Sequence, residues 1–224
     1  MEAVLLAGLC IFAGICAVVC GCSLRASWRH AIPTAAPLAL AVMAFGASAS
    51  LFTMHPGALR EWLVGGFAFG SWPPALAWSV TLAVAAGYLA FIFEKWLLGR
   101  PRRRRSAPGA LPAQLMAADL PTRAATMDLV GITARKPIRY WGISSLTVAG
   151  EELFFRVAAP GVLLASGESV AIAILVPAGL YAVNHLGFGV RTVLAKGLLG
   201  VAWGIAAWVG GALPATVLAH LVCQ

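Results

Sequence analysis

Charged residues are scarce in this chain. They make up 11% of its 224 residues, whereas 61% of the residues are hydrophobic. A soluble domain usually has about 25% charged and 45–50% apolar residues, so the composition excludes an ordinary soluble fold. The long apolar runs also lack the period-two alternation of a membrane barrel. We therefore predict an all-α protein, a polytopic transmembrane helical bundle.

Several motifs that would indicate other functions are missing. The zinc-protease spacing His-Glu-x-x-His does not occur. Neither serine nor cysteine is well placed as a nucleophile, since Cys223 lies roughly 60° off the helix face of His220. We find no internal repeat of the kind that builds transporters from two halves. Only Glu2, and no basic region, precedes the first apolar segment, so we expect neither a cleaved signal peptide nor a lipoprotein signal.

The apolar runs have room for about seven spans, in a range of roughly six to eight. We place the spans at about 3–24, 32–54, 72–98, 139–165, 170–188, 192–209 and from 213 onward. The apolar segment 61–71 is too short to span and is expected to be re-entrant or interfacial. Pro177 should kink the fifth span. Gly200 and Gly204 should form a small-residue packing face on the sixth span.

Basic residues dominate the few charges, and the net charge is +8. With seven spans, Arg25 and Arg29, the stretch from Arg100 to Arg139, and Arg191 with Lys196 all fall on one side of the membrane. The positive-inside rule then puts the N-terminus outside and the C-terminus inside. The run Arg100–Arg105 is expected to contact anionic lipid headgroups. Because no aromatic residues interleave these arginines, we expect no nucleic-acid partner.

Three charged side chains lie inside an apolar stretch, Gly150-Glu151-Glu152-Leu153-Phe154-Phe155-Arg156. Each charge at the centre of a bilayer costs about 2.5–3.5 kcal/mol on insertion scales, so these three need partners or a function. On a helix, Glu152 and Arg156 share a face and can pair. Glu151 points roughly 100° away from that face. The spacing predicts one structural ion pair and one free carboxylate.

Other polar side chains of the last spans can meet Glu151. They are Asn184 and His185 near the end of the fifth span, and His220 with Gln224 one helical turn later on the last. A lone intramembrane histidine is usually a packed residue, but two histidines with an unpaired glutamate favour a functional cluster. Glu151 could take a proton from water while a histidine stabilises an oxyanion. The glutamate and histidines could instead bind zinc, or form a proton relay in a transporter.

This pattern resembles the CAAX-protease and bacteriocin-processing family (CPBP, or ABI) of glutamic intramembrane proteases. The family motif Glu-Glu-x-x-x-Arg matches Glu151, Glu152 and Arg156. An aromatic residue followed by three residues and a histidine matches Tyr181 and His185. The third motif, His-x-x-x-Asn, matches His220 but has Gln224 in place of the asparagine. The resemblance covers about 139–224, and its three motifs occur in order on consecutive expected spans.

The resemblance implies a metal-independent endopeptidase without a cofactor. In it, Glu151 activates the attacking water, His185 helps to hold that water, and His220 stabilises the oxyanion. Glu152 and Arg156 orient the site, with Asn184 and Gln224 as supporting residues. The substrate is expected to be a tail, leader or sorting tag of a membrane-associated protein. An immunity or scaffold protein of the same family, without proteolysis, is the alternative.

The implied organisation has three regions. Residues 1–105 form N-terminal transmembrane helices that end in the basic run, 106–138 form a cytoplasmic loop, and 139–224 form the catalytic transmembrane core. We expect the protein in the cytoplasmic (inner) membrane of a prokaryote.

Overall fold

The fold is a bundle of helices, seen in a computed structural model. The structure describes residues 1–24, 32–57, 137–186, 190–210, 216–217 and 220–221, with separate positions between 77 and 96. No strand occurs among these residues, which confirms the all-α class. The chain is an integral membrane protein, as its composition predicted.

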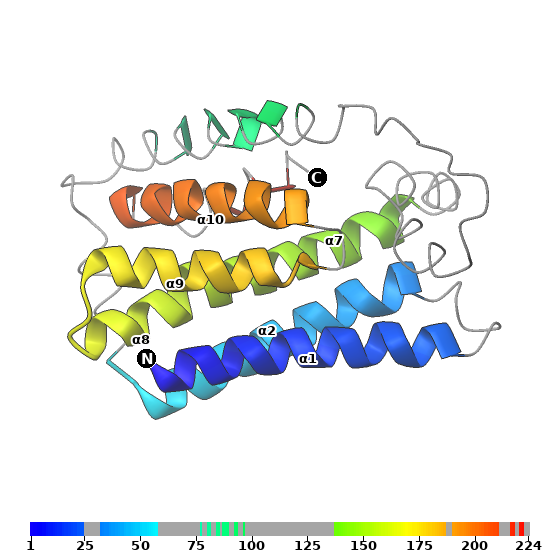
Figure 1. The fold of residues 1–224 in the computed structure, drawn as a ribbon, viewed down its shortest axis with the longest axis horizontal. Coiled ribbons are helices and arrows are strands. Elements are labelled where there is room, and N and C mark those ends of the chain that lie inside the picture. Colours follow the sequence, from blue (N-terminus) through cyan, green and yellow to red (C-terminus); the bar gives the residue numbers. More distant parts are fainter. Residues whose placement is uncertain are drawn as a thin grey trace, which may run out of the picture.

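Two long apolar helices form the N-terminal layer. Helix α1 (Glu2–Leu24) packs along α2 (Ile32–Met54), and Figure 1 shows the pair side by side below the other helices. Both bounds agree with the first two predicted spans. Helix α2 also packs along α7 (Pro137–Glu152). The backbones of α2 and α7 come close at Gly150, where an added Cβ would lie 3.2 Å from the carbonyl oxygen of Ala41. The residue before Glu151 therefore has to be very small.

The predicted fourth span is one continuous helical stretch with a change of winding in its middle. Helix α7 is followed directly by a π-helical turn, η3 (Leu153–Ala158), and then by α8 (Ala159–Ala165). Single π-turns inside longer helices are rare and often occur at functional sites. Here the π-turn begins immediately after the two glutamates.

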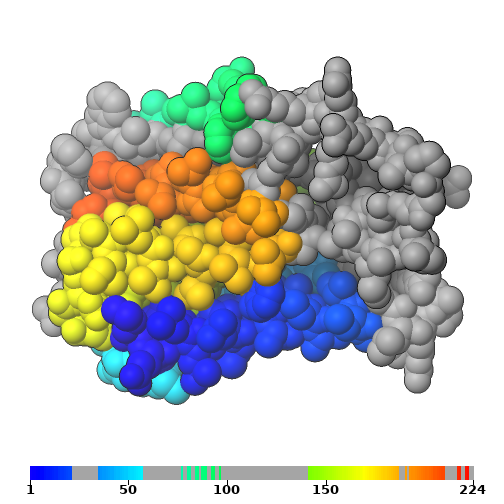
Figure 2. All heavy atoms as spheres, viewed as in Figure 1, coloured from blue at the N-terminus to red at the C-terminus, as the bar shows by residue number. Residues whose placement is uncertain are grey.

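Helices α9 (Val170–Val183) and α10 (Val190–Gly210) pack closely against each other. An added Cβ on Gly200 would lie 3.1 Å from the Cα of Ala178, and one on Gly204 would lie 2.9 Å from the Cγ2 of Ile174. Since the partner number falls as the glycine number rises, the two helices are antiparallel. The predicted packing face of Gly200 and Gly204 is therefore confirmed. Figure 2 shows α10, α9 and α1 as successive layers on one face.

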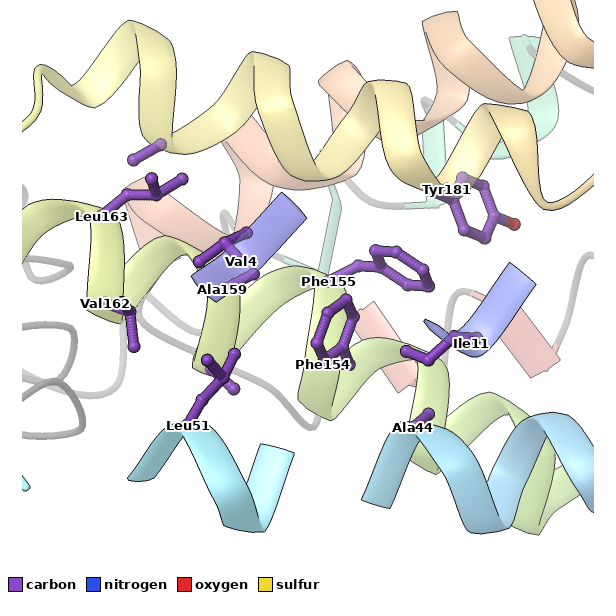
Figure 3. Close-up of a cluster of buried hydrophobic side chains, with 12 residues drawn as sticks. Val4, Ile11, Ala44, Leu51, Phe154, Phe155, Ala159, Val162, Leu163 and Tyr181 are labelled. Carbon is purple, nitrogen blue, oxygen red and sulfur yellow. The ribbon is translucent and has the colours of Figure 1, made fainter. Parts of the chain in front are cut away.

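The buried core lies where α1, α2, η3, α8 and α9 meet. Phe154 and Phe155 of η3 pack edge to face, with ring centroids 4.9 Å apart. Phe155 also packs edge to face against Tyr181, with ring centroids 5.5 Å apart, and Figure 3 shows these rings in the buried cluster that also contains Ile11. The π-turn thus fills the centre of the bundle with aromatic side chains and at the same time carries Arg156.

Three helices of the described part are long and apolar enough to cross a membrane, at Glu2–Gly21, Ala35–Met54 and Thr192–Val209. The last coincides with the predicted sixth span. Helix α9 ends at Val183, before the predicted end of the fifth span, because Asn184 and His185 form a turn. The segment 61–71, the basic run, the loop 106–136 and Gln224 lie outside the described residues. The total number of spans and their orientation remain predictions.

Candidate active site

Two acidic side chains at the end of α7 lie at the centre of the site. Glu152 is 0% exposed and Glu151 is 4% exposed, so both are buried inside the bundle. The small residue Gly150 lets α7 lie close to α2 at this level. The start of the π-turn then directs the next residues into the core. Both carboxylates point toward His220, which lies 68 residues after Glu152 in the sequence.

Glu152 is held by partners on three sides. Its Oε1 lies 2.9 Å from Nδ1 of His220, and its Oε2 lies 3.5 Å from Nε of Arg156. The Thr216 side chain also hydrogen-bonds this carboxylate. The predicted ion pair of Glu152 and Arg156 is therefore present, although 3.5 Å is longer than a typical hydrogen bond. Arg156, itself 1% exposed, also donates from Nη1 to the backbone oxygen of Phe155 at 3.3 Å.

Glu151 approaches the other side of the same imidazole. Its Oε2 lies 3.7 Å from Nε2 of His220, while Nδ1 is engaged by Glu152. One histidine therefore stands between the two carboxylates. The sequence predicted that Glu151 would lack the arginine partner, and the arginine does pair with Glu152. What the spacing did not predict is that both glutamates face His220.

Aromatic rings enclose the imidazole. The Trp203 ring of α10 lies 4.4 Å from the His220 ring, centroid to centroid, and the Tyr181 ring of α9 lies 6.2 Å away. The Arg156 guanidinium carbon lies 5.2 Å from the centre of the Tyr181 ring, a cation–π distance. These rings hold His220 in place and exclude water around its pair with Glu152, which strengthens electrostatic interactions there.

His185 lies in the turn after α9, beside Tyr181. Its Nδ1 is 2.8 Å from the backbone oxygen of Tyr181, and the two rings are 4.8 Å apart. Because a carbonyl oxygen only accepts, Nδ1 carries the proton of this hydrogen bond, and Nε2 can accept one when the ring is neutral. Asn184 ends α9, and its amide atoms are buried without a hydrogen-bond partner in the described part of the chain.

Comparison with known families matches residues 134–224 to the model described as type II CAAX prenyl endopeptidase Rce1-like. This C-terminal region is therefore similar to the Rce1-like CAAX endopeptidase family. The family is one of membrane proteases that act on membrane-associated proteins. Neither the curated proteins nor the solved structures contain a match to the chain.

The matched CAAX endopeptidase region contains every residue predicted for the site. The structure brings together Glu151, Glu152, Arg156 and His220. His185 lies on the other side of Tyr181, whose ring is close to both histidines. Gln224 lies outside the described residues. Sequence reasoning missed Trp203 and Thr216 as neighbours of the site. Trp203 lies on the same predicted helix as Gly200, so the packing face was the signal that could have found it. Among the described residues, no three His, Cys, Asp or Glu side chains are grouped so that they could hold a metal ion.

Proposed function

We propose that the protein is a glutamic intramembrane endopeptidase that hydrolyses a peptide bond in a membrane-associated protein. The observation that carries this proposal is the single imidazole between two buried carboxylates, on the residues that match the family motifs. A pair of acids that share one histidine but differ in their other partners can have different roles. Glu152 is occupied by Arg156 and His220, whereas Glu151 keeps an oxygen beyond hydrogen-bond distance of the imidazole.

Glu151 is the base in this proposal. Its carboxylate takes a proton from a water molecule while the water oxygen bonds to the carbonyl carbon of the substrate. The carbonyl π-electrons move to oxygen and give a tetrahedral oxyanion. When that oxyanion collapses, the carbon–nitrogen bond breaks, and the leaving amine takes the proton from Glu151. The products are a new carboxyl end and a new amine, and no electrons are gained or lost.

His220 stabilises the oxyanion. In this proposal Nε2 of His220 donates to the oxyanion, while Nδ1 is engaged by Glu152 at 2.9 Å, which fixes the orientation of the ring. Removal of one such donor typically lowers kcat by about 10²–10³. His185 presents Nε2 as an acceptor for water, which suits a role in holding the nucleophile. Asn184 and Gln224 support the site through their amides.

The substrate proposed here is a tail, leader or sorting tag at the membrane. Because the described helices are apolar and Glu151 is buried among them, we infer that substrate reaches Glu151 along the bilayer or its surface. The basic run Arg100–Arg105 would hold the adjoining loop against anionic headgroups. The membrane concerned is proposed to be the prokaryotic cytoplasmic membrane, with the N-terminus outside and the C-terminus inside.

The test compares wild type with Glu151→Gln in the same host by C-terminal mass spectrometry of membrane proteins. Glu168→Gln, in the turn before α9, is the matched control for loss of one carboxylate. We expect one set of tails to be shortened with wild type and Glu168→Gln, and to stay intact with Glu151→Gln. Cleavage by Glu151→Gln would refute the mechanism.

Two other outcomes would point to the alternative functions. Loss of cleavage on chelation, with stoichiometric zinc in the purified protein, would indicate a zinc enzyme instead. Identical tails with and without the wild-type protein would indicate a binding or immunity protein.

A further inference from the structure

Trp203 is a buried aromatic residue of α10 that lies outside the three motifs that carry the family resemblance. It is 0% exposed and is the largest fully buried side chain in the described part of the chain. Tryptophan is seldom buried completely, because its side chain is large and carries an N–H group. Gly200 and Gly204, on either side of it in the sequence, bring α10 against α9 at Ala178 and Ile174. The packing of these two helices therefore determines where the indole lies.

Of the two aromatic rings beside the His220 imidazole, the indole of Trp203 is the closer. The ring centroids of Trp203 and His220 are 4.4 Å apart, and their planes are inclined by 46°. The Tyr181 ring is 6.2 Å away and nearly perpendicular, at 86°. Glu152 and Glu151 approach the imidazole at its two nitrogens. The imidazole is thus contacted by carboxylates at its nitrogens and by the indole beside them.

The two carboxylates do not by themselves fix the plane of this imidazole. Glu152 engages Nδ1 of His220 at 2.9 Å, and a single hydrogen bond holds one atom while the ring can still tilt about it. Nε2 lies 3.7 Å from Glu151, which is beyond hydrogen-bond distance. The terminal torsion of a histidine is broad, so it does not select one plane either. A flat ring packed against the imidazole can select one, and Trp203 is in place to do so.

We propose that Trp203 is a positioning residue that fixes the plane of the His220 imidazole and keeps Nε2 on the side of Glu151. In the proposed function, Nε2 donates to the oxyanion that forms beside Glu151. Such a donor is effective only within about 2.7–3.1 Å of the oxyanion, so a tilt of the ring would remove its effect. The contact between the two rings stands on the geometry alone, while its effect on cleavage rests on the proposed function.

Nuclear magnetic resonance of the purified protein with labelled histidines tests the positioning without any substrate. The signals of His220 are identified by their loss in His220→Gln. An indole packed at 4.4 Å should shift the imidazole proton signals through its ring current, and a fixed plane should give a single set of signals. We expect both in the wild-type protein. Two sets of His220 signals in folded wild type, or signals without a ring-current shift, would overturn the proposal whether or not any variant of Trp203 folds.

Two replacements of Trp203 distinguish a flat ring from filled space. Trp203→Phe keeps an aromatic ring, whereas Trp203→Met fills irregular space without one. We expect a single set of His220 signals in Trp203→Phe, and several sets or broadened signals in Trp203→Met. The control is Trp208→Met, which removes an indole five residues later on α10, about 140° around the helix. If Trp203→Met keeps one narrow set, or if Trp203→Phe disturbs the signals as much, the aromatic ring does not fix the plane.

Cleavage by the same variants tests the consequence for catalysis. The substrate is a peptide with the tail sequence found by C-terminal mass spectrometry. Because a positioned oxyanion donor acts in the transition state, Trp203→Met should lower kcat about tenfold or more with little change in KM, and Trp203→Phe should keep most of kcat. An equal fall in kcat with Trp208→Met, or a change in KM alone, would contradict the positioning role. If wild type shortens no tail, the proposed function fails, and the His220 signals still decide whether Trp203 fixes the imidazole.

Discussion

Replacing Glu152 by glutamine should damage the fold as well as the activity. Glutamine keeps the size of the side chain but removes the negative charge that faces Arg156 at 3.5 Å and His220 at 2.9 Å. Arg156 is 1% exposed and has no carboxylate other than Glu152 within ion-pair distance in the described part of the chain. Removing one partner of a buried ion pair costs about 3–5 kcal/mol, because the other charge remains buried and uncompensated.

This free-energy loss converts into a large change in thermal stability. For a protein of this size, each kcal/mol lowers Tm by about 2–4 °C, so Glu152→Gln should lower Tm by roughly 6–20 °C. The assay is thermal unfolding of the purified protein in detergent. Glu151→Gln should lower Tm much less, because its neighbour His220 lies 3.7 Å away and keeps Glu152 as its partner.

A second substitution identifies the cause of that loss. The double variant Glu152→Gln/Arg156→Met also removes the buried guanidinium that would otherwise lack a partner. Replacing both partners of a buried ion pair by groups of similar volume is often nearly neutral for stability. The double variant should therefore regain part of the lost Tm while staying inactive. If Glu152→Gln is as stable as wild type, or if Arg156→Met adds further loss instead of rescue, the buried ion pair does not stabilise the fold as argued.

The other predictions concern helix packing, capping and the second histidine. Gly200→Ala should lower the free energy of unfolding by about 1–3 kcal/mol, because the added Cβ would lie too close to Ala178. Gly179→Ala has open space around it and should be neutral or slightly stabilising. Thermal unfolding of both variants checks this difference. Ser169→Ala removes the N-cap of α9, whose side-chain oxygen accepts from the Ile172 amide at a long 3.4 Å. The loss in free energy of unfolding should therefore fall near the lower end of the usual range of about 0.5–2 kcal/mol. An unchanged urea midpoint would show that the cap contributes nothing. His185→Ala should abolish tail shortening with little change in Tm, because the residue lies half-buried in a turn. A fall in Tm as large as that of Glu152→Gln would indicate a structural role instead.

Local spacing predicted the parts of the site that lie on one helix. Glu152 and Arg156 pair as their four-residue separation required. The bounds of α1 and α2 follow from apolar runs that end in polar or proline-containing segments, and these were predictable for the same reason.

The spacing of residues along one helix could not predict contacts between residues on different helices. Nothing in the sequence states that His220 meets Glu152 across 68 positions, although the motif resemblance placed both in one site. The π-turn was invisible as well, since the pattern of apolar residues around Phe154 and Phe155 is compatible with ordinary α-helical winding.

The π-turn makes the length of this stretch as important as its composition. Because η3 contains a wider turn than the helices on either side, deleting one residue between Leu153 and Ala158 would let the chain wind as an ordinary α-helix. Because the wider turn takes up about one extra residue, α8 would keep nearly the same orientation relative to α7 after the deletion. The change would fall on the turn itself, where a deletion of Leu153, for example, would leave Arg156 three residues after Glu152 instead of four. A one-residue deletion should therefore preserve the helix bundle and still disturb the pair of Glu152 and Arg156, although both residues would remain in the sequence.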